Sequence, residues 1–438
     1  MKALVIFYSF APQNNCAAIP NTKLVKYLEH EDVDITLITN ALLPDMEVDE
    51  SLLSDNVRKL RRFEVHRSKL FLSTVAAVRT NATNSGVKLK MKAEKRPFRA
   101  KVVSVIKSAY FGLSELDWKI AARNVVDKEL CNEHFDVVFS SYPALGTHIL
   151  AEYVLQKGIA DKWIADFRDP MYYEEYDKHN YKKKLRKQHS IEKKADHIVV
   201  VSEGAKEKFL FNDVPESKIT YLPNGYDPDD FDIEKTTANQ ESQTLRFFYA
   251  GQLYAGKRDL SVLFRAVSEL EHENVIDRNN VWFEYAGNEW PIFEQFADQY
   301  GLKDRCVNYG FVTRQKVMEI MSEIDCSIVA THNTLKDQGV VTGKVFELLL
   351  VGKPIVAIVG GDLPNSELGE IVKECKAGIV YEQANAEDDY QTLKTWLKNV
   401  YGQKQADRKL ATTLDVKARD RYSYSNIAHQ LYSIMTKL

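Results

Sequence analysis

The stretch Leu245-Arg-Phe-Phe-Tyr-Ala-Gly-Gln-Leu-Tyr-Ala-Gly-Lys-Arg258 decides the fold of the second half of the chain. Its first six residues are apolar or aromatic apart from one arginine, which is typical of a buried β-strand. Gly251 then allows a close approach of the backbone, and Gly256 allows a turn. Apolar residues at helical spacing over 260–270 predict a helix. Strand, glycine loop and helix in this order indicate one unit of a parallel sheet covered by helices.

The same alternation of apolar runs and amphipathic stretches continues on both sides of this unit. Continuous apolar strands that alternate with helices indicate a parallel sheet with both faces covered. The predicted strands are residues 3–8, 33–38, 137–140, 163–165 and 197–201 in the first half, and 245–250, 281–285, 306–309, 326–329, 355–359 and 378–380 in the second. The predicted helices include residues 20–30, 144–156, 181–195, 260–270, 314–324, 344–350 and 423–438.

A polar, turn-rich stretch over 224–244 interrupts the alternation and predicts a linker. We therefore expect an α/β protein with two Rossmann-like domains, over 1–230 and 231–417, followed by a C-terminal helix over 418–438. Residues 68–107 do not follow the pattern, and we interpret them as an insertion followed by a basic helix. Ligands of such folds bind beyond the carboxyl ends of the strands, so we expect a site in the cleft between the domains.

The composition is that of a core-forming globular protein. Hydrophobic residues make up 45% of the 438 residues and charged residues 28%. The net charge of −3 is too close to balance to indicate a nucleic-acid partner. The five cysteines are odd in number and form no Cys-x-x-Cys pair, which argues against a disulfide framework or a zinc site and favours a reducing cytosol. No apolar run approaches the ~18 residues of a membrane span, and residues 3–8 are interpreted as a strand rather than a signal peptide.

Lys257 and Arg258 are the first candidates for ligand binding. We expect them at the N-terminus of the helix that follows, where free N–H groups, the helix dipole and cationic side chains all favour an anion. The alternative interpretation is a solvated basic start of a helix. A P-loop is excluded, because Arg258, and not Ser or Thr, follows Lys257.

The second candidate is the stretch Gly343-Lys-Val-Phe-Glu347. Gly343 and Lys344 begin a predicted helix and so present a further helix N-terminus. Glu347 lies one turn inside among apolar neighbours, where a carboxylate needs a partner. The two hydroxyls of a nucleotide ribose can donate to it. The alternative is a glutamate that caps the helix or forms a salt bridge.

Short segments along nearly the whole chain occur in an order and at a spacing that match those of a known protein family. They are residues 7–12, 165–170, 192–203, 222–227, 251–258, 310–312, 344–347 and 352–354. Together they resemble glycosyltransferase family 4, which has the GT-B fold. The resemblance implies two Rossmann-like domains that face each other across a cleft, with residues 418–438 crossing back to the first domain. It also implies a retaining, metal-independent hexosyltransferase of bacterial surface polysaccharide biosynthesis, which takes a sugar from a UDP- or GDP-sugar to a glycan or lipid-linked acceptor.

Carried over residue by residue, the resemblance places the donor in the second domain. Lys257 and Arg258 would hold the diphosphate, Glu347 the ribose and the backbone at Val312 the base, while the helix start would offer N–H groups to the phosphates. The full set of expected donor-binding residues is Gly251, Gln252, Lys257, Arg258, Val312, Gly343, Lys344, Val345 and Glu347.

The first domain is expected to bind the acceptor. Asp166, Arg168 and Asp169 follow the strand at 163–165 and would point into the cleft, although an ion pair of purely structural role is the alternative. His148 stands at a predicted helix start on the same side. The expected acceptor-binding residues are Asn14, Asn15, Asp166, Arg168 and Asp169, and the expected catalytic residues are His148, Asp166, Lys257, Arg258 and Glu347.

The segment 88–107 is strongly basic, with eight basic residues and one acid. Apolar residues are interleaved, and an amphipathic basic helix can lie on anionic lipid. The alternative is a solvated charged face. We therefore expect a cytoplasmic protein that contacts the inner face of the plasma membrane through this segment.

No cofactor or metal is expected. Two Asp-x-Asp matches occur, at Asp32 and Asp34 and at Asp227 and Asp229. Metal-dependent transferases hold a cation with that spacing, but here the first match enters a strand and the second lies in a turn.

Two departures from the family pattern leave other functions open. Gln252 stands where the family often has Arg, and Gly339 stands eight residues before Glu347, where it often has a second Glu. A non-catalytic partner subunit of a transferase is therefore one alternative, against which Lys257 and Glu347 argue. A sugar-nucleotide epimerase of the same layout is another.

Overall fold

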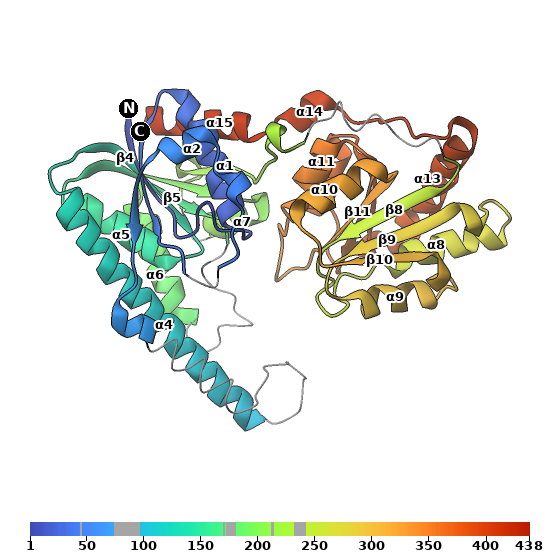
Figure 1. Cartoon of the computed structure of the whole chain (residues 1–438), viewed down its shortest axis with the longest axis horizontal. Helices are drawn as coiled ribbons and strands as arrows, with labels where there is room; N and C mark the ends of the chain where they lie inside the picture. The colour runs from blue at the N-terminus through green and yellow to red at the C-terminus, as the bar shows by residue number, and fades with distance from the viewer. Residues whose placement is uncertain (44–45, 74–96, 170, 172–180, 212–213, 232–241) are drawn as a thin grey trace. The chain divides into compact units, whose positions relative to one another are not determined.

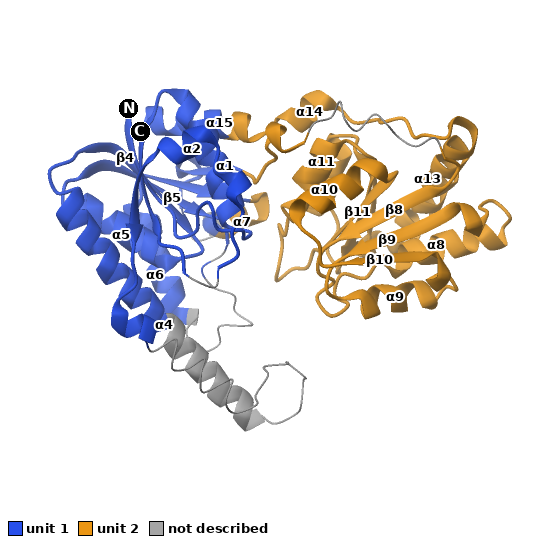
Figure 2. Ribbon diagram, in the orientation of Figure 1, with its two compact units in different colours: residues 1–201, 209–222, 428–438 blue, residues 202–208, 223–427 orange. Residues whose placement is uncertain are grey.

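The computed structural model describes residues 1–43, 46–73, 97–169, 171, 181–211, 214–231 and 242–438, with the side chains of 97–111, 181 and 210–211 left aside. The chain divides into two compact units, each of which is described by itself (Figure 2). Unit 1 comprises residues 1–201, 209–222 and 428–438, and unit 2 comprises residues 202–208 and 223–427.

The division after residue 222 comes earlier than the expected boundary at 230. Residues 223–230 are tied to unit 2 by hydrogen bonds that the sequence pattern does not reveal. The Tyr226 N–H donates to the Tyr422 carbonyl at 2.9 Å. The Asp230 carboxylate accepts from the Arg314 guanidinium at 2.7 Å.

Unit 1 is built on a seven-stranded parallel sheet in the order β3-β2-β1-β4-β5-β6-β7. Figure 1 labels two of its strands, β4 and β5. Its strands are β1 (Lys2–Ile6), β2 (Asp34–Asn40), β3 (Arg61–Val65), β4 (Phe135–Tyr142), β5 (Ala160–Phe167), β6 (His197–Val200) and β7 (Ile219–Tyr221). Its helices are α1 (Ala18–Leu28), α2 (Asp55–Lys59), α4 (Pro97–Glu129), α5 (Leu145–Gln156) and α6 (Tyr181–Lys194), while α7 (Glu203–Phe211) and α15 (Tyr424–Lys437) are shared with unit 2.

The sequence predicted the five inner strands of this sheet and missed the two edge strands, β3 and β7. The central strands β1, β4 and β5 are apolar runs whose interior residues are buried. Strand β3 has the sequence Arg-Arg-Phe-Glu-Val and β7 has only three residues. Edge strands are commonly short and charged, which removes the apolar signal.

The segment 68–107 is described in part. Residues 74–96 lie outside the described residues, so the insertion expected there stays a prediction. Residues 97–107 form the start of α4, a helix of 33 residues.

Unit 2 is built on a six-stranded parallel sheet in the order β10-β9-β8-β11-β12-β13. Its strands are β8 (Leu245–Ala250), β9 (Val281–Ala286), β10 (Cys306–Gly310), β11 (Cys326–His332), β12 (Ile355–Gly360) and β13 (Gly378–Glu382). Its helices are α8 (Ser261–His272), α9 (Trp290–Asp298), α10 (Arg314–Glu323), α11 (Lys344–Val351), α12 (Glu367–Glu374), α13 (Ala386–Asp407) and α14 (Val416–Asp420). All six strands were predicted from the sequence.

Helices cover both faces of this sheet, as its apolar strands require. Phe247 and Tyr249 of β8 pack with α8, α9 and α13. Phe248, between them, faces the other way and packs with α10, α11 and α12. Successive side chains of a strand point to opposite faces, so one apolar run serves two layers of helices. The expected fold of two helix-covered parallel sheets is thereby confirmed.

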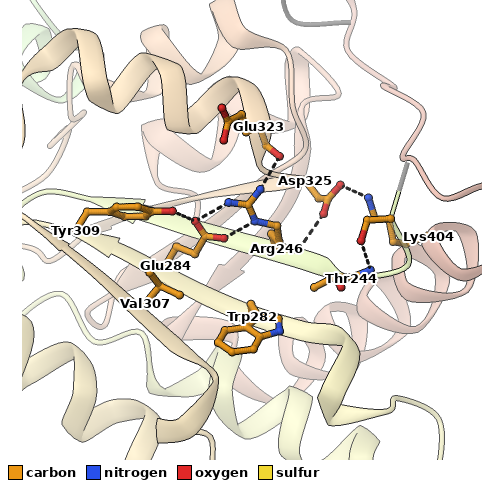
Figure 3. A pocket seen from close by; sticks show the side chains of 10 residues that line it. Thr244, Arg246, Trp282, Glu284, Val307, Tyr309, Glu323, Asp325 and Lys404 are labelled. Atoms are coloured by element: carbon orange, nitrogen blue, oxygen red, sulfur yellow. Dashed lines mark hydrogen bonds and ion pairs between the residues drawn. The ribbon is translucent and has the colours of Figure 1, made fainter. Parts of the chain in front are cut away.

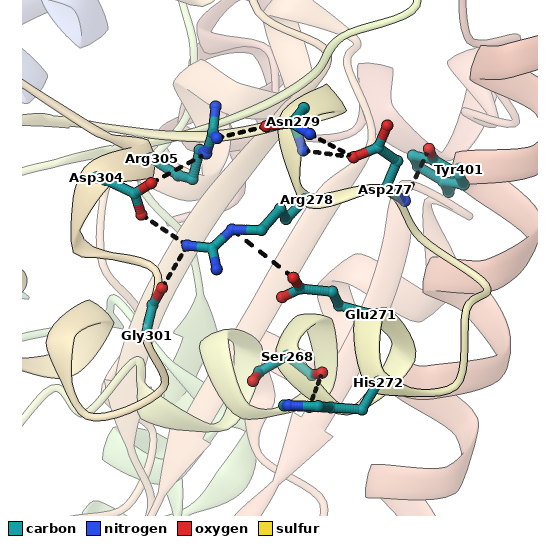
Figure 4. Close-up of polar contacts among 10 residues, drawn as sticks. All are labelled: Ser268, Glu271, His272, Asp277, Arg278, Asn279, Gly301, Asp304, Arg305 and Tyr401. Atoms are coloured by element: carbon teal, nitrogen blue, oxygen red, sulfur yellow. Dashed lines mark hydrogen bonds and ion pairs between the residues drawn. The ribbon is translucent and has the colours of Figure 1, made fainter.

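Polar contacts hold the turns that lead into β9 and β10 (Figure 4). The Arg278 guanidinium donates to the Gly301 carbonyl at 2.6 Å and to Asp304 at 2.8 Å. Arg305 donates to the Asn279 side chain at 2.5 Å. These contacts lie at the amino ends of the strands and fix their relative positions, which leaves the carboxyl ends free for function.

The C-terminal residues 428–438 belong to unit 1. His429 lies 3.1 Å from the Glu31 carboxylate. The chain thus crosses back to its first unit, as expected. Of the helices that the structure describes, none combines the length and the apolar character that a membrane crossing needs.

Candidate functional site

The expected donor-binding residues gather at the carboxyl edge of the unit 2 sheet. The strand order turns back between β8 and β11, and ligands of such sheets bind at this point. Three segments supply the residues: the loop after β8, the turn after β10 and the start of α11. They carry Gly251, Gln252, Lys257, Arg258, Val312, Gly343, Lys344, Val345 and Glu347.

The loop after β8 has an unusual backbone that Glu289 stabilises. Tyr254, Ala255 and Gly256 have φ values of 51°, 54° and 89°. In this left-handed region, a residue that has a side chain is destabilised by steric contact with the backbone. The Glu289 carboxylate accepts hydrogen bonds from the N–H groups of Leu253 (2.5 Å), Tyr254 (3.0 Å) and Ala255 (2.9 Å). The sequence analysis did not find Glu289, because it lies more than thirty residues further along the chain.

Lys257 and Arg258 do not begin a helix, contrary to the sequence prediction. Helix α8 begins at Ser261, and both residues lie in the turn before it, because the left-handed residues carry the backbone away from a helical path. Lys257 is exposed. The Arg258 guanidinium stacks over the Tyr254 ring at 4.5 Å. Any attraction for an anion here therefore comes from the side-chain charges and not from the dipole of α8.

Lys344 contributes a side chain as well as its backbone. Its ammonium donates to the Ala250 carbonyl at 2.6 Å. Burial and the neighbouring charge of Arg258 lower the pKa of Lys344, and Glu347 acts in the opposite direction. A Cβ atom on Gly251 would lie 2.0 Å from this Nζ, and Gly251 has φ +134°. A glycine is thus needed at this position for space and for backbone conformation.

Glu347 has a protein partner, which the sequence analysis left open. Its Oε1 accepts from Arg314 Nε at 3.0 Å, and Arg314 also binds Asp230. Burial works against the charge, but the two carboxylates outweigh it and raise the pKa of Arg314. The Glu347 side chain is still 24% exposed, so a ligand can reach it. Arg314 has no motif of its own and was missed.

Helix α11 begins without a side-chain cap. Gly343 is its N-cap residue, and the helix dipole favours an anion at this end. The N–H groups of Val345 and Phe346 donate to the carbonyls of Thr342 (3.1 Å) and Gly343 (3.3 Å).

Gly339 stands where the family often has a glutamate, and local packing explains the difference. Its φ is +70°. A Cβ atom here would lie 2.8 Å from Ser202 Oγ and 2.9 Å from Gly204 Cα, both within unit 2. Any side chain at this position would have to displace backbone atoms.

A cavity of about 550 Å³ lies at the carboxyl edge of the unit 1 sheet. The strand order of this sheet turns back between β1 and β4, and both strands end at the cavity. The lining residues are Tyr8, Ser9, Ala17, Asn21, Arg67, Ser114, Glu115, Trp118, Ser141, Tyr142, Pro143, Ala144, Leu145, Gly146, Met171 and Lys184.

Charged and aromatic side chains form the wall of this cavity. Arg67 is buried and donates to Tyr8 Oη and to Ser114 Oγ, the latter at 3.0 Å. Burial raises the pKa of Glu115, while the charges of Lys119 and three lysines of α6 lower it. Trp118 packs against Tyr8, with 5.6 Å between ring centroids. The sequence analysis missed these residues, because α4 meets the sheet only in the folded chain.

Asp166 and Arg168 form a buried ion pair, which corrects the expectation that they face a ligand. Asp166 Oδ2 accepts from Arg168 Nε at 2.9 Å and from Ser141 Oγ at 2.7 Å, and Asp166 is fully buried. Arg168 also donates to the Leu222 carbonyl at 3.1 Å. The pair thus joins the ends of neighbouring strands. Asp169 is exposed.

Asn14 and Asn15 lie before α1. The Asn15 side chain accepts from the N–H groups of Ala17 (3.0 Å) and Ala18 (2.8 Å), so it stabilises the start of that helix. The Asn14 N–H donates to the Glu47 carbonyl at 2.8 Å.

His148 is a core residue, which corrects its expected catalytic role. It is fully buried, with 4.8 Å between its ring and that of Phe167. Its Nδ1 lies 2.8 Å from Ser140 Oγ. Burial and, to a lesser extent, the charge of Lys187 lower the pKa of His148 to about 3. The imidazole is therefore neutral at physiological pH and has no access to a substrate.

A second cavity, of about 320 Å³, lies over the starts of β8 and β11 in unit 2 (Figure 3). Arg246 makes two hydrogen bonds to Glu284, at 2.5 and 3.0 Å, and Tyr309 donates to the same carboxylate at 2.7 Å. Lys404 donates to Asp325 at 2.6 Å. Each of the two cations in this network, Arg246 and Lys404, is paired with a carboxylate. Within the described residues, no cluster of three or more His, Cys, Asp or Glu side chains is placed to hold a metal ion.

Comparison with known proteins agrees with this geometry. The family model of Glycosyltransferase Family 4 matches residues 90–230, and that of Glycosyl transferases group 1 matches residues 244–399. No curated protein sequence matches the chain.

Several solved structures share the fold over the whole chain. Sucrose-phosphate synthase from Thermosynechococcus elongatus is 14% identical with a TM-score of 0.61, covering 100% of this chain and 98% of that one. HepE from Anabaena in complex with UDP-glucose is 14% identical with a TM-score of 0.57 and full coverage of both chains. The lipopolysaccharide outer core galactosyltransferase WaaB is 12% identical with a TM-score of 0.57, also with full coverage of both.

The two helix-covered parallel sheets, with candidate sites at their carboxyl edges, define a protein of the GT-B class. The two family matches then identify the chain as a GT-B glycosyltransferase of the family 4 type, as its sequence resemblance implied.

Proposed function

We propose that this glycosyltransferase moves a hexosyl group from a UDP- or GDP-sugar to a glycan or lipid-linked acceptor, with retention of anomeric configuration and without a metal or other cofactor. The observation that carries the proposal is the group of cations at one sheet edge. Lys257, Arg258 and Lys344 gather there beside the uncapped start of α11. A nucleoside diphosphate is the substrate group that such a set of charges fits.

The donor would bind along this edge. Lys257, Arg258 and the N-terminal end of α11 would face the diphosphate, and the backbone at Val312 would face the base. Glu347 accepts from the ribose hydroxyls, while Arg314 holds its carboxylate in position. The structure of HepE with UDP-glucose supports a donor of this class.

In the proposed reaction, the bond between the sugar and the diphosphate breaks and a bond to an acceptor hydroxyl forms on the same face. The hydroxyl proton passes to a phosphate oxygen of the leaving group. The cations stabilise the negative charge that grows on the diphosphate, which is the role a metal has in other transferases. No protein nucleophile is required.

The acceptor would bind in the cavity of unit 1. Glu115, Asn21 and Lys184 offer hydrogen-bonding groups there, and Trp118 and Tyr8 offer aromatic surface. Such a mixture suits a sugar, which has hydroxyls and an apolar face. We further propose a role in bacterial surface polysaccharide synthesis at the inner face of the plasma membrane, with residues 88–107 in contact with lipid.

The first test is thermal unfolding of the protein with UDP, GDP and their sugars, with and without EDTA. A ligand at a hundred times its Kd stabilises by about 2.7 kcal/mol, which is measurable as a shift in Tm. We expect a shift with one nucleotide and its loss in Lys257→Ala. Lys373→Ala, an exposed lysine on α12 of the same unit, serves as the matched control.

No shift with any nucleotide would refute the donor site. A shift that EDTA abolishes would refute metal independence. Binding without sugar transfer to any acceptor extract would favour the non-catalytic partner subunit, which the absence of a side chain at Gly339 keeps in consideration.

A further inference from the structure

A histidine and an aspartate form a hydrogen-bonded pair at the end of β11, and neither belongs to the sites described above. His332 is the last residue of β11, and its Nε2 lies 2.8 Å from Asp337 Oδ2. The His332 side chain is 40% exposed and that of Asp337 is 34% exposed, so a ligand can reach both. Asp337 is also the only acid in the sequence between β11 and α11.

The pair lies at the carboxyl edge of the unit 2 sheet, beside the turn that carries Lys257. Strand β11 is the neighbour of β8 in this sheet (Figure 1). On its other side, His332 is in register with Gly360 of β12. A Cβ atom on Gly360 would lie 3.9 Å from the Lys257 carbonyl. His332 and Asp337 are therefore close to one of the cations that are proposed to hold the diphosphate.

Hydrogen bonds fix the position of Asp337 in the loop after β11. The Asp337 N–H donates to the Thr334 carbonyl at 3.0 Å and to Thr334 Oγ1 at 3.2 Å, which closes a tight turn. The Thr331 hydroxyl of β11 donates to the Val340 carbonyl at 2.9 Å, which attaches the other end of the loop to the sheet. The fold thus places this carboxylate without the help of a ligand.

The Asp337 carboxylate is ionised and has one oxygen available. The hydrogen bond with His332 lowers the pKa of Asp337, and the charges of Lys208 and Lys257 act in the same direction, although burial opposes them. An ionised carboxylate only accepts hydrogen bonds, so His332 Nε2 is the donor. Among the residues that the structure describes, no group donates to the second oxygen, Oδ1. A ligand that donates a hydrogen bond can bind there.

The chemistry of the donor indicates which of its groups meets Asp337. A carboxylate beside a phosphate-binding lysine repels a phosphate and accepts from hydroxyls. In the proposed donor site, the ribose already has Glu347 and the base has the backbone at Val312. The remaining group that adjoins the diphosphate and donates hydrogen bonds is the sugar to be transferred.

We propose that Asp337 recognises the transferred sugar by accepting a hydrogen bond from one of its hydroxyls, and that His332 is the positioning residue that holds the carboxylate. The assignment rests on the proposed function, since the diphosphate fixes where the sugar lies. A site built to bind a hydroxyl rejects an analogue that lacks it, because the carboxylate is then left unpaired. Asp337 would therefore select among donor sugars.

Titration calorimetry that compares sugar-nucleotides with bare nucleotides tests the assignment. The ligands are UDP, GDP, UDP-glucose, UDP-galactose, UDP-N-acetylglucosamine and GDP-mannose. We expect Asp337→Asn to bind the preferred sugar-nucleotide about tenfold or more weakly than the wild type. It should bind the corresponding bare nucleotide as tightly or more tightly, because a negative charge beside Lys257 is removed.

Monodeoxy analogues of the preferred sugar-nucleotide identify the hydroxyl. With one of them, the wild type and Asp337→Asn should bind equally, since the contact is missing in both. His332→Ala should weaken binding of the intact sugar-nucleotide by about threefold or more. His332→Gln should restore it, because the glutamine amide can still donate to Asp337.

Asp298→Asn is the matched control. It makes the same change at an exposed residue of unit 2, at the C-terminal end of α9. This variant should bind every ligand like the wild type. The Tm of each variant without ligand shows that it is folded.

Equal losses for the sugar-nucleotide and the bare nucleotide in Asp337→Asn would overturn the proposal, because Asp337 would then act only on the diphosphate site. Slower sugar transfer at unchanged affinity would overturn it in favour of an acid–base role. Unchanged affinity and rate would overturn it and leave the donor site in place. A wild type that binds no nucleotide would instead refute the donor site itself, and the assignment with it.

Discussion

Lys344 shows how much the carboxyl edge of the unit 2 sheet depends on single atoms. Its Nζ reaches the Ala250 carbonyl across the space that a side chain on Gly251 would fill. The ammonium is partly buried and stands near the charge of Arg258, and both effects lower the pKa of Lys344. Positive charge is thus concentrated at the edge where a diphosphate is proposed to bind.

Gly251→Ala should destabilise the protein and abolish the nucleotide-induced shift in Tm. The new Cβ would lie 2.0 Å from Lys344 Nζ at a φ that disfavours side chains. We expect a loss of about 2–3 kcal/mol in the free energy of unfolding, measured by urea denaturation. Gly402→Ala is the control, because nothing lies within 4 Å of its Cβ position in α13 and it should be stabilising. Equal effects of the two substitutions would contradict the steric argument.

Glu347 and Asp230 both bind Arg314. Substituting each of them in turn therefore distinguishes a structural role of Glu347 from a ligand-binding role. If Glu347 accepts from the ribose, Glu347→Ala should raise the donor Kd by about tenfold or more. Asp230→Ala removes a partner of Arg314 without removing a ribose contact, and should raise it less. Titration calorimetry with the nucleoside diphosphate measures both. Equal losses would mean that Glu347 acts only by holding Arg314.

At the scale of elements, β4, α5 and β5 enclose a neutral imidazole. Ser140 Oγ accepts from Trp163 Nε1 at 2.8 Å and lies 2.8 Å from His148 Nδ1. These polar contacts and the Phe167 ring fix the packing of α5 on the sheet. The sequence around His148 therefore reflects packing in the core of unit 1.

His148 should make the stability of unit 1 depend on pH. Its folded pKa of about 3 is lower than the unfolded value near 6.5, so the unfolded chain binds a proton that the folded chain does not. Stability is full above pH 6.5 and falls as the pH falls toward 3. Between pH 7 and 5, the wild type should lose about 2 kcal/mol more than His148→Asn in urea denaturation. Parallel curves for the two proteins would show that His148 has the same pKa in the folded and the unfolded state.

At the scale of the whole molecule, the two units carry separate groups of candidate residues. Lys257, Arg258 and Lys344 belong to unit 2, and the cavity with Glu115 and Trp118 belongs to unit 1. If the units divide the two substrates between them, substitutions in one should leave binding to the other unchanged.

Glu115→Gln should therefore weaken sugar binding in unit 1 by several-fold and leave the UDP or GDP shift in Tm as it is. Saturation-transfer NMR with a set of methyl glycosides measures the first effect, because it detects millimolar binding. Glu129→Gln, on the same helix but outside the cavity lining, is the control. Unchanged glycoside signals in Glu115→Gln would remove the cavity from the proposed function.

The local pattern of apolar and polar residues in the sequence determined most of the fold. The six strands of unit 2 and the inner strands of unit 1 are apolar runs, and burial in a parallel sheet demands such runs wherever the chain supplies them. The glycine loop after β8 and the start of α11 were predicted for the same reason, since each depends on neighbouring residues. The edge strands β3 and β7 were missed, because an edge needs little apolar surface.

By itself, then, the sequence determined the two-sheet α/β architecture, the family resemblance and the segments that meet at the carboxyl edge of the unit 2 sheet. Only the tertiary structure decided that His148 and Asp166 are core residues, that Glu289 holds the loop after β8 and Arg314 pairs with Glu347, and that α4 exposes a second apolar face. Burial and pairing between distant residues depend on which surfaces meet, and no local pattern contains that information.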